Sequence, residues 1–179
     1  MKKKIFAACL VICLLATAVI GTTLAYFTDE TDAVTNTFTV GKVKIDLTET
    51  PSGDNHEYKM IPGTNLTKDP KVIVKDGSED CYVFVKVVAS EGLENYITYS
   101  VDSRWTKLDG VDNVYYREAT NVTGADAEYP VLTGNTVTVL NTVTEITGTQ
   151  PTLTFTAYAI QKASFEGNPT GAWAAGSWN

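Results

Sequence analysis

The chain has 179 residues, with 21 acidic side chains against 14 lysines and arginines, and its formal net charge is −7. This balance disfavours electrostatic binding to nucleic acid or to an anionic lipid surface, because both need a basic face. With one histidine and three cysteines, the sequence also offers few ligands for a zinc site.

The first 25 residues have the layout of a secretory signal peptide. Three lysines at positions 2–4 form a basic start, and the run from Ile5 to Leu24 carries no charge. Thr23 and Ala25 place small residues where a signal peptidase needs them, which predicts cleavage after Ala25. The apolar run is close to the ~20 residues that can span a bilayer, so an uncleaved membrane anchor is the alternative.

Cleavage would leave residues 26–179, which is enough for one domain with a sizeable core. Loss of the three lysines raises the excess of acidic side chains from seven to ten. Cys9 and Cys13 leave with the signal peptide, so Cys81 has no partner for an intrachain disulfide. We therefore expect an acidic domain outside the cell that depends on its core or on neighbouring molecules.

The remaining sequence is dominated by strand patterns. Val43, Ile45 and Leu47 alternate with polar residues, as in a half-buried strand. Residues 81–89 are apolar at nearly every position, which predicts a strand covered on both faces. Further strands are expected at 72–74, 113–118, 136–143 and 152–160.

Helical signal is scarce, with short turns of helix expected only within 91–101 and 171–178. Several short strands separated by regular turns predict an all-β fold, an antiparallel β-sandwich formed by a single domain. The pattern alone does not separate a jelly-roll sandwich from an immunoglobulin-like one.

Motifs for catalysis are sparse. His56 lies in a polar loop without a His-Glu-x-x-His pattern, so neither a zinc protease nor a Ser-His-Asp triad is indicated. Cys81 opens an apolar strand after Glu79 and Asp80, whose charges raise the pKa of a thiol, so we expect a buried cysteine and not a nucleophile. The acidic clusters lack the spacing of a calcium-binding loop. We predict no enzyme activity, no catalytic residue, no cofactor and no metal.

The segment after the predicted cleavage site carries the most specific pattern. Residues 25–29, Ala-Tyr-Phe-Thr-Asp, precede Asn-Thr-Phe-Thr-Val-Gly at 36–41 and the strand-like Lys-Val-Lys-Ile-Asp-Leu at 42–47. This order resembles the junction of SipW-dependent secreted proteins of the TasA/camelysin (CalY) family. Residues 60–87, 114–118 and 152–165 resemble the later strands of that family.

The resemblance implies a jelly-roll β-sandwich with little helix, exported across a Gram-positive membrane. In TasA-like fibres the mature N-terminal segment inserts as a strand into the neighbouring subunit. Residues 26–40 would be that donor strand here, with apolar residues Tyr26, Phe27, Val34, Phe38 and Val40. An added strand gains main-chain hydrogen bonds and side-chain pockets, and head-to-tail contacts that do not close form filaments.

The sequence therefore predicts a structural protein of the extracellular biofilm matrix, either a fibre subunit or an accessory. Its expected partners are further copies or related matrix proteins, with signal peptidase during export, no nucleic acid, and membrane contact only through an uncleaved signal. The alternative is a monomeric secreted domain that binds a cell-surface molecule, with Phe38 in the first strand of its own sandwich. The metalloprotease label given to camelysin-type proteins is the least favoured, because no zinc motif accompanies it.

Overall fold

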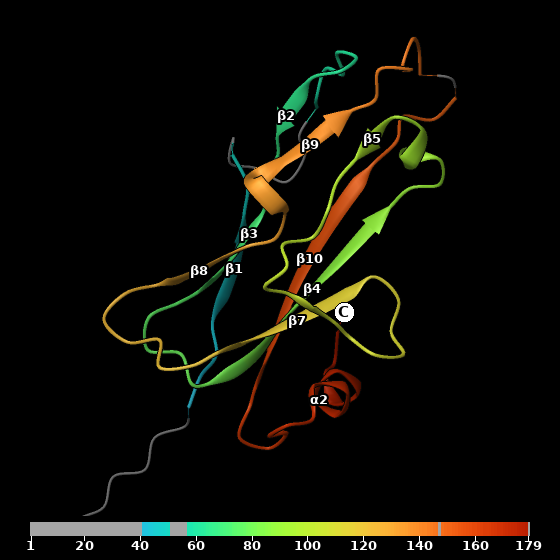
Figure 1. Cartoon of the computed structure of the whole chain (residues 1–179). Coiled ribbons are helices and arrows are strands. Elements are labelled where there is room, and N and C mark those ends of the chain that lie inside the picture. Colours follow the sequence, from blue (N-terminus) through green and yellow to red (C-terminus); the bar gives the residue numbers. More distant parts are fainter. Residues whose placement is uncertain (1–40, 51–56, 147, 179) are drawn as a thin grey trace, which may run out of the picture. The chain divides into compact units, whose positions relative to one another are not determined.

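The computed structural model describes residues 41–50, 57–146 and 148–178 (Figure 1). These residues form antiparallel strands with little helix, which confirms the expected all-β sandwich. The strands are β1 (Ile45–Thr48), β2 (Asn65–Thr67), β3 (Lys71–Val74), β4 (Cys81–Ala89), β5 (Ile97–Thr98), β6 (Thr106–Lys107), β7 (Val114–Ala119), β8 (Ala127–Pro130), β9 (Thr136–Val139) and β10 (Leu153–Gln161). The helical elements are η1 (Leu93–Asn95), η2 (Thr133–Asn135) and α2 (Pro169–Ala175).

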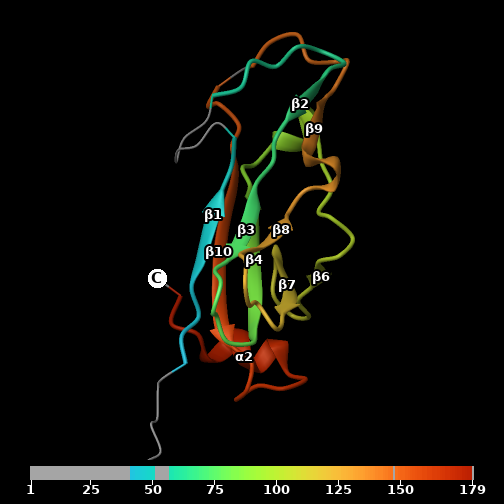
Figure 2. The same cartoon turned by 90° about the vertical axis from the view of Figure 1, so that its left-hand side faces the viewer.

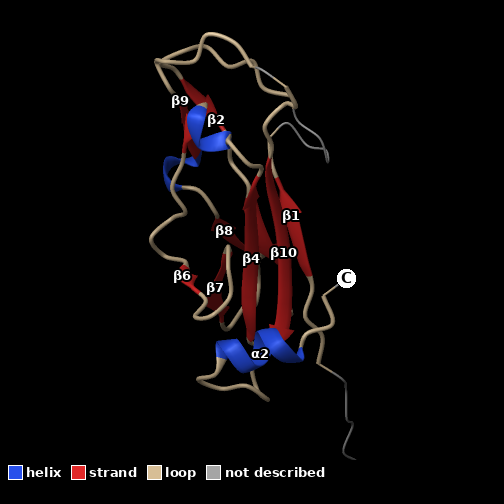
Figure 3. Ribbon diagram, turned by 90° about the vertical axis from the view of Figure 1, so that its right-hand side faces the viewer, coloured by secondary structure: helices blue, strands red, loops and turns tan. Residues whose placement is uncertain are grey.

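The strands pair in three antiparallel sheets, in the orders β10-β4-β7-β6, β1-β3-β8 and β2-β9-β5. Because β2 leads into β3 and β8 leads into β9, the two three-stranded sheets continue one another as one layer of the sandwich. The four-stranded sheet is the other layer (Figures 2 and 3). Several neighbouring strands, such as β10 and β4, come from distant parts of the chain.

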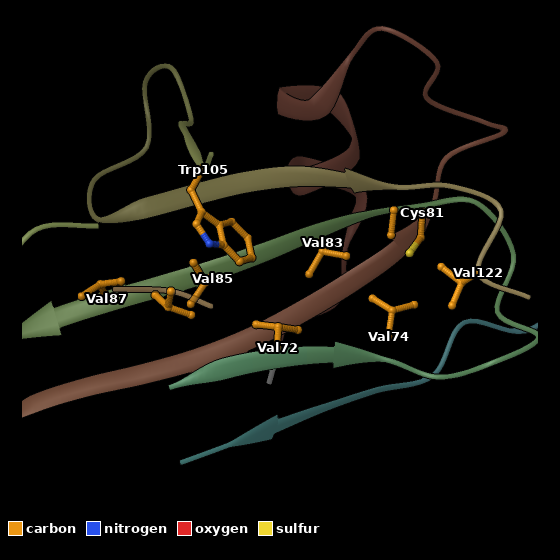
Figure 4. Close-up of a cluster of buried hydrophobic side chains, with 10 residues drawn as sticks. Val72, Val74, Cys81, Val83, Val85, Val87, Trp105 and Val122 are labelled. Carbon is orange, nitrogen blue, oxygen red and sulfur yellow. The ribbon is translucent and has the colours of Figure 1, made fainter. Parts of the chain in front are cut away.

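The main core lies between the layers and depends on alternate residues of β4. Cys81, Val83 and Val85 are fully buried and point from β4 toward Val72 and Val74 of β3 (Figure 4). Each buried valine contributes about 1.5–3 kcal/mol relative to an exposed one. Since β-branched side chains also suit a strand, the same residues favour the local conformation and hold the layers together.

The opposite face of β4 is covered by α2. Tyr82 and Phe84 are fully buried, and the Trp173 ring lies 5.2 Å from the Phe84 ring between centroids. The Asn168 side chain caps the helix by accepting a hydrogen bond of 2.8 Å from the Gly171 amide, and a proline follows at the first helical position. The expected coverage on both faces is confirmed for residues 81–85, whereas Lys86, Val88 and Ala89 are exposed.

Several expected boundaries are wrong by a few residues. The strand expected over 136–143 ends at Val139. The short turn of helix expected within 91–101 is present as η1. The short strands β2, β5, β6 and β8 were not predicted from the sequence. These strands have two to four residues and depend on pairing with distant partners, so their local sequence carries little signal.

Removing the Trp173 ring tests the role of α2. We expect Trp173→Ala to lower the free energy of unfolding by about 2 kcal/mol, because the ring is half-buried and contacts Phe84 and Tyr158. Thr170→Ala, on an exposed position of the same helix, is the matched control and should change little. Urea unfolding measures both; equal midpoints for the two variants would contradict a structural role for α2.

Candidate functional site

The strands β1 and β10 lie side by side at one margin of the sandwich, each at the edge of its own layer (Figures 2 and 3). Among the described residues no strand pairs with either of these edges. We call this margin the seam and define it by residues 43–47 and 153–161. A margin where two strand edges face each other without pairing is a place where a further strand can be added.

Hydrogen bonds define the direction of the backbone groups in β10. The Lys162 amide donates to the Asp80 carbonyl at 2.8 Å, and the Ser90 amide donates to the Thr152 carbonyl at 2.9 Å. In an antiparallel pair the hydrogen-bonding direction alternates, so even-numbered positions of β10 face β4. The groups facing the seam therefore belong to Leu153, Phe155, Ala157, Ala159 and Gln161.

The same reasoning applies to β1. The Lys75 amide donates to the Lys44 carbonyl and the Glu79 amide to the Lys42 carbonyl, both at 3.0 Å. Even-numbered positions therefore face β3. The backbone groups of Val43, Ile45 and Leu47 face the seam from the other side.

The side chains at the seam are apolar and incompletely buried. Phe155, Ala157 and Ala159 of β10 pack against the main core but remain partly exposed. On the other strand Ile45 is also partly exposed, and Leu47 is 38% exposed. The apolar layer is therefore unfinished at this margin, and a strand placed along it would remove apolar surface from water.

The opposite margin of the sandwich is filled by side chains. Trp105 is 5% exposed and donates from Nε1 to the Pro130 carbonyl at 2.8 Å. The Arg117 guanidinium lies 4.7 Å from the Tyr129 ring centroid and 5.8 Å from that of Trp105. Burial lowers the pKa of Arg117, and cation–π contacts with the two rings compensate part of its lost hydration. The two margins are therefore unequal, and the seam is the less covered one.

A hollow of about 800 Å³ opens at the end of the seam where β10 begins. Its apolar walls include Leu47, Met60, Leu66, Ile97 and Phe155. A volume of this size can hold one or more large side chains or a small molecule.

An ion pair lies within the hollow. Lys68 Nζ is 2.8 Å from Glu49 Oε1, and the two side chains are 10% and 12% exposed. The Tyr58 hydroxyl donates to the same carboxylate oxygen, and burial followed by the nearby Glu49 raises the pKa of Tyr58 above its usual value. The Lys68 ammonium also lies 4.8 Å from the Tyr58 ring centroid and 5.4 Å from that of Phe155. The charges of Lys68 and Glu49 thus compensate each other, and the apolar part of the lining is left for an occupant.

The residues predicted from sequence as an assembly strand, namely Tyr26, Phe27, Val34, Phe38 and Val40, lie outside the described residues. The same holds for Thr23 and Ala25 of the cleavage site, and for His56. Cys81 is fully buried, as expected, and burial followed by the charge of Asp80 raises the pKa of its thiol to about 11.

Carboxylates of the acidic loops cap backbone amides. Asp76 accepts from the Gly124 amide, Asp126 from the Asp76 amide, and Asp80 from the Asn121 amide. In the described parts of the chain, no three His, Cys, Asp or Glu side chains are grouped so that they could hold a metal ion.

Comparisons with protein-family models, with curated proteins and with solved structures return no match. The resemblance to the TasA/camelysin family therefore stays a prediction. Within the ranges that the structure describes, no helix has the length and apolar character needed to cross a membrane.

Neither the seam nor the hollow was found by sequence reasoning. Lys68 and Glu49 are 19 positions apart in polar surroundings, and no local pattern marks them as a pair. The one available signal was the strand over 152–160, which has no charged residue, but its place at a sheet edge depends on the whole topology.

Breaking the ion pair should destabilise the fold. We expect Lys68→Met to lower the free energy of unfolding by about 3 kcal/mol, because the carboxylate of Glu49 loses its counter-charge in a largely buried place. The double variant Lys68→Met/Glu49→Leu should recover at least half of this loss. The control Lys71→Met breaks the more exposed pair with Glu128 and should cost under about 1 kcal/mol. Urea unfolding that shows no difference between Lys68→Met and Lys71→Met would contradict a stabilising role for the pair of Lys68 and Glu49.

The Cys81 thiol should be unreactive in the folded protein. At pH 8 a pKa of about 11 leaves roughly one thiol in a thousand as thiolate, and the side chain has no exposed surface. We expect labelling of residues 26–179 by a thiol-specific reagent to be at least about a hundredfold slower in buffer than in 6 M guanidinium. Rapid labelling of the native protein would show that β4 opens easily.

Proposed function

We propose that this protein is a secreted structural subunit that assembles with further copies by strand addition, with the seam as the acceptor of an N-terminal donor segment. The observation that carries the proposal is the nine-residue strand β10, which has five positions whose backbone groups face the seam beside partly exposed apolar side chains. Strand addition satisfies such groups and covers such side chains at the same time.

The composition of β10 supports this role. A long sheet edge in a protein that stays monomeric is commonly protected by charged residues or proline. The sequence Leu-Thr-Phe-Thr-Ala-Tyr-Ala-Ile-Gln has neither. The short edge strand β6, in contrast, has two residues, one of them Lys107. We infer that the β10 edge is kept free of such protection because it is used.

The donor in this proposal is the segment of residues 26–40. Its apolar residues Val34, Phe38 and Val40 are separated by even numbers of positions, so they share one face of an extended strand. The resemblance of this segment to the junction of the TasA/camelysin family supports the same role. The protein would then be a fibre subunit or an accessory of an extracellular matrix.

The test uses purified residues 26–179, examined by electron microscopy and size-exclusion chromatography. We expect filaments or an oligomer ladder, and we expect Ala157→Pro to reduce assembly at least about tenfold. Proline at this position removes a backbone donor that faces the seam and leaves the hydrogen bonds with β4 in place.

Ala157→Ser is the matched control, because it keeps the amide and a small side chain. Circular dichroism and urea unfolding should show that both variants fold. A folded Ala157→Pro protein that assembles as well as Ala157→Ser would mean that β10 is not the acceptor.

A second candidate function is a monomeric secreted domain that binds a surface molecule of the cell. The hollow of about 800 Å³ favours it, since this volume lies in the range of ligand sites. A stable monomer at high concentration, with the N-terminal segment folded along its own seam, would support this candidate over the first.

A further inference from the structure

We infer that the hollow receives Phe38 of a second copy, whose donor segment runs antiparallel to β10. This inference rests on the proposed function and adds the direction of the donor and the side chain that is recognised. It follows from where the chain enters the domain, where the hollow lies, and how long the segment of residues 26–40 is.

The hollow and the attachment point of the N-terminal segment lie at opposite ends of the seam. The Glu79 amide donates to the Lys42 carbonyl, and the Lys162 amide donates to the carbonyl of the neighbouring Asp80. The chain therefore enters the domain beside the end of β10. The hollow contains Leu47 and Thr48 from the end of β1, together with Leu153 and Phe155 from the start of β10. Residues 42–48 span about 20 Å at 3.3 Å per residue, which is the distance along the seam between the two ends.

Because of these positions, the two possible directions of a donor strand lead to different assemblies. A donor whose C-terminal end lies at the hollow runs antiparallel to β10 and places its own domain above the hollow. The attachment end of each copy then meets the hollow end of the next, and this head-to-tail contact repeats without closing, as a filament requires. A donor whose C-terminal end lies at the opposite end of the seam runs parallel to β10. This direction brings two attachment ends together, which favours a closed, reciprocal dimer.

The direction also determines which aromatic residue reaches the hollow. In the antiparallel arrangement the C-terminal end of the donor segment lies at the hollow, so Phe38, three residues before Gly41, lies there. In the parallel arrangement, and equally when a chain inserts into its own seam, the far end of the segment with Tyr26 and Phe27 would reach the hollow.

The chemistry of the hollow suits a phenylalanine. Lys68 and Glu49 form an ion pair, and the Tyr58 hydroxyl donates to the same carboxylate. The lining also includes the apolar side chains of Leu47, Met60, Leu66, Ile97 and Phe155, beside polar ones such as Glu57, Lys59 and Gln150. With Phe38 in the hollow, Val34 shares its face and lies near Ala157 and Ala159, whose small side chains leave room for it. The 13 residues from 26 to 38 extend over about 43 Å, more than the nine residues of β10 need.

The experiment places the photoreactive amino acid p-benzoylphenylalanine at position 38 or, separately, at position 27 of residues 26–179. Each labelled protein is mixed with a heavy-isotope copy, allowed to assemble, irradiated, and mapped by mass spectrometry. We expect position 38 to cross-link to Met60 or Leu47 of the other isotopic copy, with at least about tenfold lower yield at these residues from position 27.

A hollow that is cross-linked from position 27, or from position 38 within the same copy, overturns the inference. Filaments that form without any cross-link in the hollow overturn it as well. In these cases the proposed function still stands, because copies can assemble along the seam in another direction. Absence of filaments under all conditions contradicts the proposed function itself.

A pair of neighbouring substitutions gives a readout that does not need the photoreactive group. Met60 lines the hollow, whereas Ile61 is 51% exposed and does not. We expect Met60→Glu to slow assembly at least about tenfold and Ile61→Glu to leave it unchanged, with both proteins folded by circular dichroism. Equal assembly rates for the two folded variants would contradict a role for the hollow.

Discussion

The two-sided burial of β4 is the constraint on which the rest of the fold depends. Its odd-numbered residues pack against β3 across the sandwich, and its even-numbered residues Tyr82 and Phe84 pack under α2. The backbone groups of a buried strand need hydrogen-bonding partners along both edges. For β4 these partners are β7 and β10. β10 pairs with β4 along nine residues, yet it lies at the margin of its sheet. The same interaction that builds the core therefore creates the edge at which we place the function.

Side chains fill the two margins of the sandwich to different degrees. On the side of β7 and β8, Trp105, Tyr129 and Arg117 fill the space between the layers. On the side of β1 and β10, small residues such as Ala157 and Ala159 leave the apolar layer unfinished. At the end of the seam, the ion pair of Lys68 and Glu49 lies beside apolar side chains such as Leu47 and Met60. A strand with alternate apolar residues complements this margin in shape and in hydrogen bonding.

Local sequence was sufficient for some of these features. The run over 81–89 predicted a strand covered on both faces, because apolar residues occur at both parities, and the alternation from Val43 to Leu47 predicted a half-buried strand. The pairing of Phe155 with Val87, 68 positions apart, carries no local signal, and neither does the ion pair in the hollow. The seam arises from strand order, which is a property of the whole chain, so it could not be predicted from any segment alone.

The most direct test of the central claim is amide hydrogen exchange at β10 before and after assembly. The amides of Phe155, Ala157 and Ala159 face the seam, whereas those of Thr156 and Tyr158 bond to β4 and serve as internal references. If a strand is added at the seam, the three seam-facing amides should gain protection on assembly and the two references should stay protected in both states. If filaments form while the seam-facing amides exchange as in the monomer, assembly uses another surface and the account is wrong.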